Sequence, residues 1–224
     1  MSRSILVKTL FGLTTIYVFL SYSWIHGAAA AVLAEDCDSD IVTQSSIRVT
    51  ELMGTAESRP IIACLNTPRV GINISHGQTR FALGLPPLVL IGPEGINEDV
   101  ISHELVHAEL ATRLGLLKRA WMLPTWFDEG MAMQVDHRLD YNLQALRRFQ
   151  SRGDLQYPAL DEIASSAFFV AGDQGKYHYA YSKCLVAHWI EKEHGSPVEL
   201  TWRLDLSQTD AKVAAAEAAC VRTP

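Results

Sequence analysis

NEDVISHELVHAELATRLG, residues 97–115, is the stretch around which the chain is organised. Asn97 is a favourable helix cap, and the two acids after it suit the positive end of a helix dipole. Apolar side chains recur at three- and four-residue spacing until Gly115, a typical helix terminator. The sequence therefore predicts one helix with His103 and His107 one turn apart on the same face. Two neutral imidazoles so placed can bind a divalent metal, with Glu104 beside them.

A catalytic zinc ion needs a third protein ligand and leaves its fourth position to water. The best candidate is Glu129, in the stretch PTWFDEGMA (residues 124–132), which follows His107 by 22 positions. That separation lets the chain turn and bring a second helix, predicted over residues 124–139, against the first. The sequence thus predicts a single metal site that His103, His107 and Glu129 share.

The two motifs together resemble the gluzincin family of zinc metallopeptidases, the thermolysin-like peptidases in the broad sense and most closely their aminopeptidase-like branch. The resemblance rests on H-E-x-x-H at residues 103–107 and W-x-x-E-G-x-A at residues 126–132, and it covers about residues 89–195. It implies a zincin-like domain, with a small mixed sheet before the zinc-binding helices. It also implies one Zn²⁺ per chain and hydrolysis of peptide bonds.

Carried over by position, the resemblance makes His103, His107 and Glu129 the zinc ligands. Glu104 would be the general base, taking a proton from the metal-bound water and later passing it to the leaving amine. Zinc lowers the pKa of that water to about 7, so a hydroxide-like nucleophile is available at neutral pH. The alternative role for Glu129 is an acid stabilised by the helix dipole, which the adjacent Asp128 fits better.

Gluzincins often add a tyrosine or histidine that hydrogen-bonds the oxyanion of the tetrahedral intermediate. The sequence YAYS at residues 179–182, with Gly195 downstream, resembles the start of the helix that carries this group. Tyr179 is therefore the first oxyanion candidate, Tyr181 the second and His178 the third. The alternative for Tyr179 is an ordinary packing role in an amphipathic helix.

The sequence departs from the family pattern at two points. No G-x-M-E-N stretch is present, so the residues by which aminopeptidases bind a free α-amine are missing, and Glu94 is left as the acid for a related role. Position 133, where thermolysin-like enzymes carry an acid near the ligands, is Met133. Asp99 or Asp128 would then orient the ligand histidines. These departures argue against a simple aminopeptidase.

Strands are predicted before the first zinc-binding helix, and helices after it. Short stretches rich in β-branched residues, punctuated by glycines and prolines, predict strands at residues 46–52, 60–65, 69–75 and 88–92. Further helices are predicted at residues 141–150, 160–166, 177–195 and 209–220, with a long loop over residues 153–175. Strands first and helices later indicate an α+β fold rather than an alternating α/β fold.

The N-terminus is predicted to be a targeting segment. Two basic residues precede an uncharged apolar core over residues 10–25, and small residues suit cleavage after Ala34. We therefore expect a signal peptide over residues 1–34. The alternative is a membrane anchor retained through residues 5–34, which are enough to span a bilayer. Either way the single domain of residues 35–224 is exported, to a periplasm or into a secretory pathway.

Four cysteines remain after export, and an even number in an oxidising compartment suggests two disulfides. Four cysteines allow three disulfide connectivities, and the sequence alone does not choose between them. We expect Cys37–Cys64 near the start of the domain and Cys184–Cys220 between its last two helices. None of the four lies in a C-x-x-C pair, which argues against a thiolate zinc site and a thioredoxin-like redox motif.

The formal net charge of −6, with no cluster of Lys and Arg along any predicted face, argues against a nucleic-acid partner. The expected partner is a peptide or protein substrate. Two alternatives stay open: a catalytically silent zincin-like binding or scaffold protein, and a zinc hydrolase of a non-peptide amide. The presence of Glu104 counts against the silent protein, because binding alone needs no base beside the metal.

Overall fold

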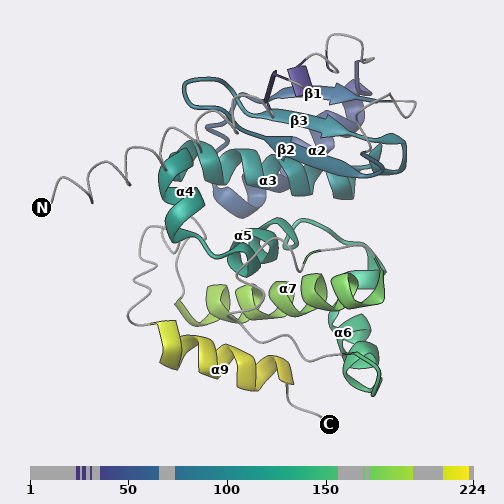
Figure 1. The fold of residues 1–224 in the computed structure, drawn as a ribbon, viewed down its shortest axis with the longest axis vertical. Helices are drawn as coiled ribbons and strands as arrows, with labels where there is room; N and C mark the ends of the chain where they lie inside the picture. The colour runs from purple at the N-terminus through teal and green to yellow at the C-terminus, as the bar shows by residue number, and fades with distance from the viewer. Residues whose placement is uncertain are drawn as a thin grey trace, which may run out of the picture.

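The computed structural model describes residues 24–25, 27–28, 31, 36–65, 74–155, 169, 172–193 and 209–221. These residues form a mixed α and β fold that is mostly helical, with a small three-stranded sheet at one end (Figure 1). The elements in chain order are α2 (Ser39–Met53), β1 (Ile61–Cys64), β2 (Gly77–Arg80), β3 (Leu88–Ile91), η1 (Pro93–Gly95), α3 (Glu98–Leu114), α4 (Leu116–Met122), α5 (Thr125–Ala132), η2 (Leu139–Tyr141), α6 (Leu143–Gln150), α7 (Asp173–Glu193) and α9 (Thr209–Val221). In the described part of the chain, no helix combines the length and the apolar character needed to cross a bilayer.

The sheet is mixed, as the sequence predicts. β3 is its central strand and runs parallel to β1 and antiparallel to β2. All four residues of β3 are buried, because their side chains alternate between two apolar clusters. Val89 and Ile91 belong to the main core shared with the helices, whereas Leu88 and Leu90 belong to a second cluster on the opposite face.

Two of the predicted strands are confirmed: residues 60–65 contain β1 and residues 88–92 contain β3. β2 was not predicted, because it begins at Gly77, a residue that marks a turn in most sequence patterns. The strand predicted at residues 69–75 lies outside the described residues, apart from its last two residues, which are not in a strand.

The prediction of a strand at residues 46–52 is wrong, because these residues lie inside helix α2. Asp38 caps this helix by accepting hydrogen bonds from two backbone N–H groups of the first turn. Ser45, Val49 and Met53 are buried at four-residue spacing, and α2 packs against α3. This contact outweighs the weak β preference of the branched residues, so a helix precedes the sheet.

The helix predicted over residues 97–115 is confirmed as α3. The side chain of Asn97 caps it by accepting a hydrogen bond from the backbone N–H of Val100, and Gly115 ends it with a positive φ of 76°. The later predicted helices are confirmed as α6, α7 and α9, with shifted ends. The short helix predicted at residues 160–166 lies outside the described residues.

The second helix of the predicted metal site is shorter than the predicted 124–139. α5 ends at Ala132, after which the chain turns. The turn is fixed by the buried carboxylate of Asp136, which accepts hydrogen bonds from the backbone N–H and the Nε of Arg138. The short helix α4, which leads into α5, was not predicted.

α5 lies between α3 and α7 (Figure 1). Its Phe127 and Met131 are fully buried. Gly130 faces α7 so closely that a Cβ built there would lie 2.5 Å from the backbone oxygen of Ser182 and 2.5 Å from Val186 Cγ2. The glycine of the second motif therefore sets how near α5 comes to α7.

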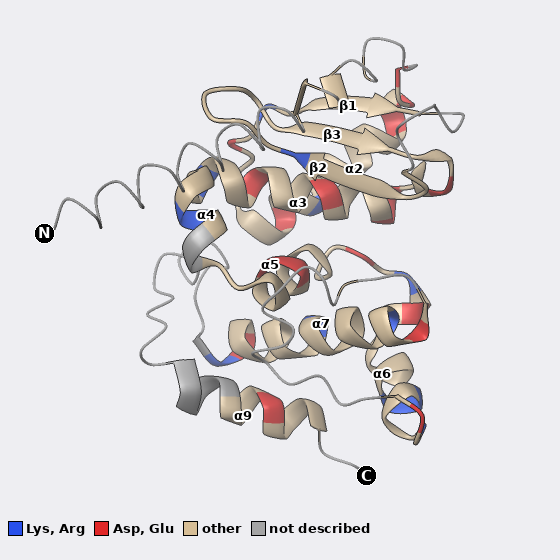
Figure 2. Cartoon of the chain, viewed as in Figure 1, with Lys and Arg blue, Asp and Glu red and all other residues tan. Residues whose placement is uncertain are grey.

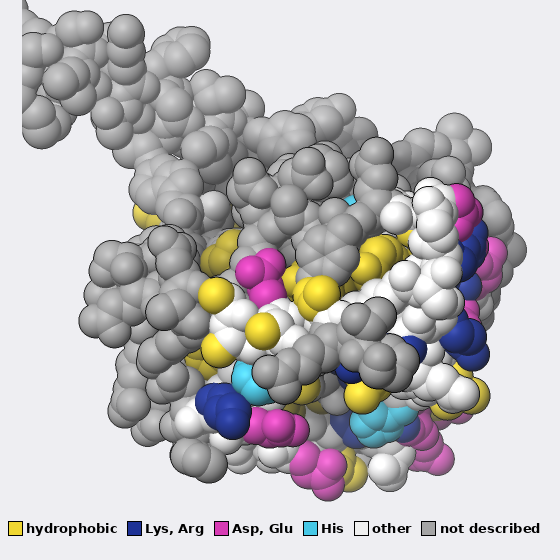
Figure 3. All heavy atoms as spheres, turned by 90° about the horizontal axis from the view of Figure 1, so that it is seen from below, with side chains coloured by type: hydrophobic (Ala, Val, Ile, Leu, Met, Phe, Trp, Pro, Cys, Tyr) yellow, Lys and Arg dark blue, Asp and Glu magenta, His cyan; other side chains and the backbone are white. Residues whose placement is uncertain are grey.

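Both predicted disulfides are confirmed. Cys37–Cys64 joins the residues just before α2 to the end of β1, and Cys184–Cys220 joins α7 to α9. Two disulfides indicate an oxidising, exported environment. The charged side chains are mixed in sign over the elements (Figure 2), and they are also mixed on the face seen from below (Figure 3).

The helical state of residues 46–52 predicts the effect of two substitutions at Ile47, whose side chain is exposed on α2. Ile47→Pro removes a helix hydrogen bond and clashes with the preceding turn, so it should lower the free energy of unfolding by about 3 kcal/mol or more. Ile47→Ala should leave that free energy unchanged or raise it slightly. Urea unfolding measures both, and equal stability of the two variants would contradict a helix here.

Candidate metal centre

His103 and His107 are buried on the face of α3 that meets α5, and Glu129 of α5 lies opposite them. Glu129 Oε2 is 3.3 Å from His103 Nε2 and 3.4 Å from His107 Nε2. The two Nε2 atoms are 3.1 Å apart. In a tetrahedral site with metal–ligand bonds of about 2.0–2.1 Å, ligand atoms lie about 3.3 Å from one another. The three residues predicted as ligands are thus brought together in a group that could hold a metal ion.

The surroundings of His107 show why this group suits a cation. Its Nδ1 lies 3.0 Å from Asp128 Oδ1, so that carboxylate favours a proton on Nδ1. Its Nε2 faces His103 Nε2 and Glu129 Oε2, and Glu129 Oε2 has no hydrogen-bond donor among the described residues. A buried carboxylate that faces two imidazoles is stabilised by a positive charge, which a protonated histidine or a metal ion supplies.

The ionisation of the buried groups agrees with this arrangement. Burial alone would raise the pKa of the Glu129 carboxyl, but His107 and His103 hold that pKa well below its usual range. Burial also opposes a charge on His107, yet the carboxylates of Asp128 and Glu129 raise its pKa. Glu129 is therefore an anion at neutral pH, and the site as a whole favours positive charge.

Asp128 takes the orienting role that Met133 cannot fill. One oxygen of its carboxylate contacts His107, and the other accepts a hydrogen bond from Arg119 Nη2 of α4. The guanidinium of Arg119 in turn lies over the ring of Phe81, 4.4 Å from its centroid. Burial raises the pKa of Asp128, but Arg119 and His107 outweigh it and lower that pKa.

The two other acids considered from the sequence lie elsewhere. Asp99 Oδ1 accepts hydrogen bonds from Arg48 Nη1 at 2.7 Å and from the backbone N–H of His137 at 3.0 Å, so it fixes the start of α3 rather than a ligand. Glu94 lies on η1 with 67% of its side chain exposed, and its Oε2 is 3.7 Å from His76 Nε2.

Glu104 is held by the strand beside it. Its Oε2 lies 2.7 Å from Thr79 Oγ1, which donates the hydrogen bond, and the same hydroxyl is 3.0 Å from the backbone oxygen of Glu104. A Cβ built on Gly77 would lie 2.7 Å from Glu104 Cγ. Gly77 and Thr79 are two apart on β2 and share a face, so the strand leaves room for the acid and orients it.

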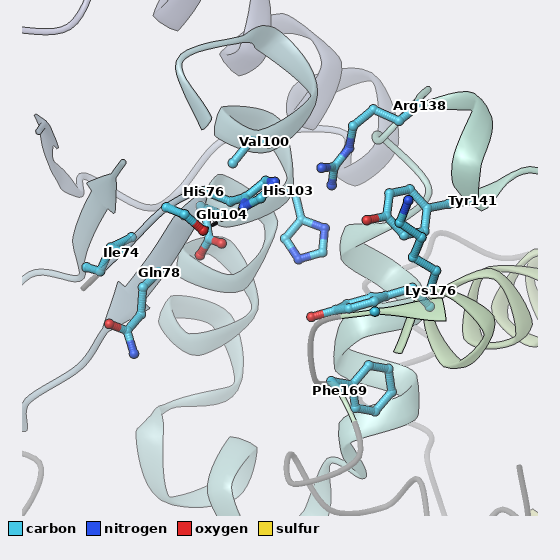
Figure 4. Close-up of a pocket in the computed structure, with 14 residues that line it drawn as sticks. Ile74, His76, Gln78, Val100, His103, Glu104, Arg138, Tyr141, Phe169 and Lys176 are labelled. Atoms are coloured by element: carbon cyan, nitrogen blue, oxygen red, sulfur yellow. Dashed lines mark hydrogen bonds between the residues drawn. The ribbon is translucent and has the colours of Figure 1, made fainter. Parts of the chain in front are cut away.

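A cavity of about 480 Å³ opens over His103 and Glu104. Figure 4 shows the ring of His103 in its centre. His76 and Gln78, at the start of β2, lie on the side of Glu104, and Arg138 and Tyr141 are among the residues on the opposite side. The general base and one of the ligands predicted from the motif therefore face the same space.

Tyr179 alone among the three oxyanion candidates lines this cavity. Its ring centroid is 6.2 Å from that of His103. Burial, and after it the nearby carboxylates, raises the pKa of Tyr179, so its hydroxyl remains a hydrogen-bond donor. Tyr181 is turned toward α9, where its hydroxyl lies 3.3 Å from Glu217 Oε1. His178 is buried outside the cavity lining.

Arg138 and Tyr141 are wall residues that the sequence did not single out. Arg138 Nε lies 3.0 Å from both carboxylate oxygens of the buried Asp136, and its guanidinium is 4.7 Å from the ring centroid of Tyr141. These contacts fix a cation in the wall opposite Glu104. Because the sequence predicts a continuous helix over residues 124–139, it does not predict the turn that directs Arg138 into the cavity wall.

Comparison of the chain with models of protein families, with curated proteins and with solved structures gave no match. The interpretation of the site therefore depends on the residues themselves and on their arrangement.

The contact between Asp128 and His107 predicts a loss of metal affinity when the carboxylate is neutralised. Asp128→Asn should weaken zinc binding about 10–100-fold, because the ligand imidazole loses the anion that fixes its tautomer. Asp99→Asn is the matched control and should change the affinity by less than about twofold, since Asp99 contacts neither histidine. Competition with a chromophoric chelator measures both, and equal affinities would refute the orienting role.

Proposed function

We propose that the chain is an exported zinc-dependent peptidase that hydrolyses peptide bonds. The observation that carries the proposal is the placement of Glu104 in the cavity wall next to the group formed by His103, His107 and Glu129. Two imidazoles and one carboxylate form a ligand set used by catalytic zinc, and an acid beside them serves as the base. The pairing of the two motifs on α3 and α5 supports zinc over other divalent metals.

Zinc, when bound, would act as a Lewis acid toward the scissile carbonyl and bring the pKa of water toward about 7. The chain's own residues do the rest. Glu104 takes the proton of the attacking water and passes it to the leaving amine, while Thr79 keeps the carboxylate in position. The hydroxyl of Tyr179 donates a hydrogen bond to the oxygen on which negative charge develops.

The cavity walls favour cleavage within a chain over removal of a single N-terminal residue. Binding a free α-amine requires an acid besides the general base, and Glu104 is the sole acid among the described residues that line the cavity. Glu94, the acid left for that role by the sequence, does not line the cavity. A volume of about 480 Å³ is in the range of sites that hold ligands the size of a short peptide.

Substitution of the base tests the proposal. Purified protein should contain about one zinc per chain by elemental analysis. Glu104→Gln should keep that metal and lose hydrolysis of a peptide library by about 10²–10⁴-fold, because the proton acceptor is lost while the three ligands stay.

A metal-free wild type would end the proposal. A wild type that carries zinc yet cleaves no peptide would favour the silent binding protein. Peptides with blocked and with free N-termini distinguish internal cleavage from aminopeptidase activity, and non-peptide amides test the remaining alternative.

The two tyrosines of α7 provide a matched pair. Tyr179→Phe should lower kcat by about 10²-fold or more while KM changes little, because a hydrogen bond made chiefly in the transition state is lost. Tyr181→Phe should leave kcat unchanged, since its hydroxyl is directed to Glu217. Steady-state kinetics measure both, and equal kcat values would exclude Tyr179 as the oxyanion donor.

A further inference from the structure

The face of the sheet that points away from the main core is buried as well. Leu88 and Leu90 are 0% exposed, and Ala63 and Leu65 beside them are also buried. These four residues form an apolar cluster separate from the main core. The partly buried residues that pack against this cluster are Trp24, Ala28, Ala31 and Ile74. Three of those four come from the N-terminal segment.

The contact of this segment with the sheet is close and specific. Trp24 Nε1 donates a hydrogen bond of 3.0 Å to the backbone oxygen of Pro86. A Cβ built on Gly27 would lie 2.8 Å from Leu88 Cδ2 and 2.9 Å from Arg80 Cδ. The backbone at Gly27 thus lies directly on the sheet, and the small Ala28 and Ala31 continue the same contact.

The same residues fall within the stretch expected to be removed as a signal peptide. Cleavage after Ala34 would take away three of the four residues that pack against the second cluster and would leave Ile74. Apolar side chains of the cluster, among them Leu88 and Leu90 of the central strand, would then become more exposed to water. A signal peptide that is cleaved off does not require a glycine that packs closely against the surface of the domain.

We propose that Trp24, Gly27, Ala28 and Ala31 are a permanent part of the folded domain and that the exported protein keeps them. The outer face of the sheet is their docking surface. The domain then begins near Trp24 rather than at residue 35, and the N-terminal segment is retained instead of being cut after Ala34. This conclusion does not depend on the peptidase activity proposed above.

The first test uses the full chain, expressed with its own N-terminus in a bacterium that exports it. Intact-mass analysis of the purified, folded protein locates the first residue. A first residue at or before Trp24 supports the proposal. A folded chain that begins after Ala31 and unfolds in one cooperative transition overturns it.

The second test measures the contact itself by thermal unfolding of full-length variants. Gly27→Leu should lower Tm by about 4 °C or more, because the new side chain forces the segment off Leu88. Trp24→Phe keeps an aromatic side chain but loses the N–H and part of the ring surface, and should lower Tm by about 2–4 °C. Ile25→Ala is the control and should change Tm by less than about 1 °C, since Ile25 is 60% exposed.

If Gly27→Leu fails to fold, the Trp24→Phe result still decides, because that substitution is small. Tm values equal to the wild type for both variants would mean that the segment does not stabilise the domain, and the proposal would be wrong.

Discussion

A buried group of two imidazoles and one carboxylate is the constraint on which the rest of the structure depends. The Nε2 atoms of His103 and His107 and the Oε2 of Glu129 lie 3.1–3.4 Å apart, where α3 meets α5. Such a group is stable only with positive charge among its members.

Three buried acids near the cavity each face a basic side chain, whereas Glu104 is held by the hydroxyl of Thr79. Asp128 and Glu129 are neighbours in sequence and would repel one another, but Asp128 is paired with Arg119 and Glu129 faces the histidines. On the opposite wall, Asp136 is 0% exposed and is paired with Arg138. Pairing of this kind allows several carboxylates to stay ionised in a small volume, which the chemistry proposed for the site requires.

The sequence predicts those parts of the site that local geometry controls. The four-residue spacing of His103 and His107 fixes their common face on any helix, and a carboxylate at residue 129 on a second helix completes the group. Thr79 could not be predicted, because its role arises only when β2 pairs with β3 and passes beside α3. The helical state of residues 46–52 was not predicted for a related reason. This helix is stabilised by its contact with α3, which is distant from it in the sequence.

The two disulfides lie in separate parts of the molecule. Cys37–Cys64 closes the part made of α2 and the sheet, Cys184–Cys220 closes the part made of α7 and α9, and neither spans the joint between α3 and α5. The ligand group does span it. The main hydrophobic core also spans it, with residues of α2, β3, α3, α5, α7 and α9 in one cluster. A bound metal would therefore add a third crosslink at a joint that apolar packing already closes, and chelation would be expected to lower the stability of the whole core rather than release one part.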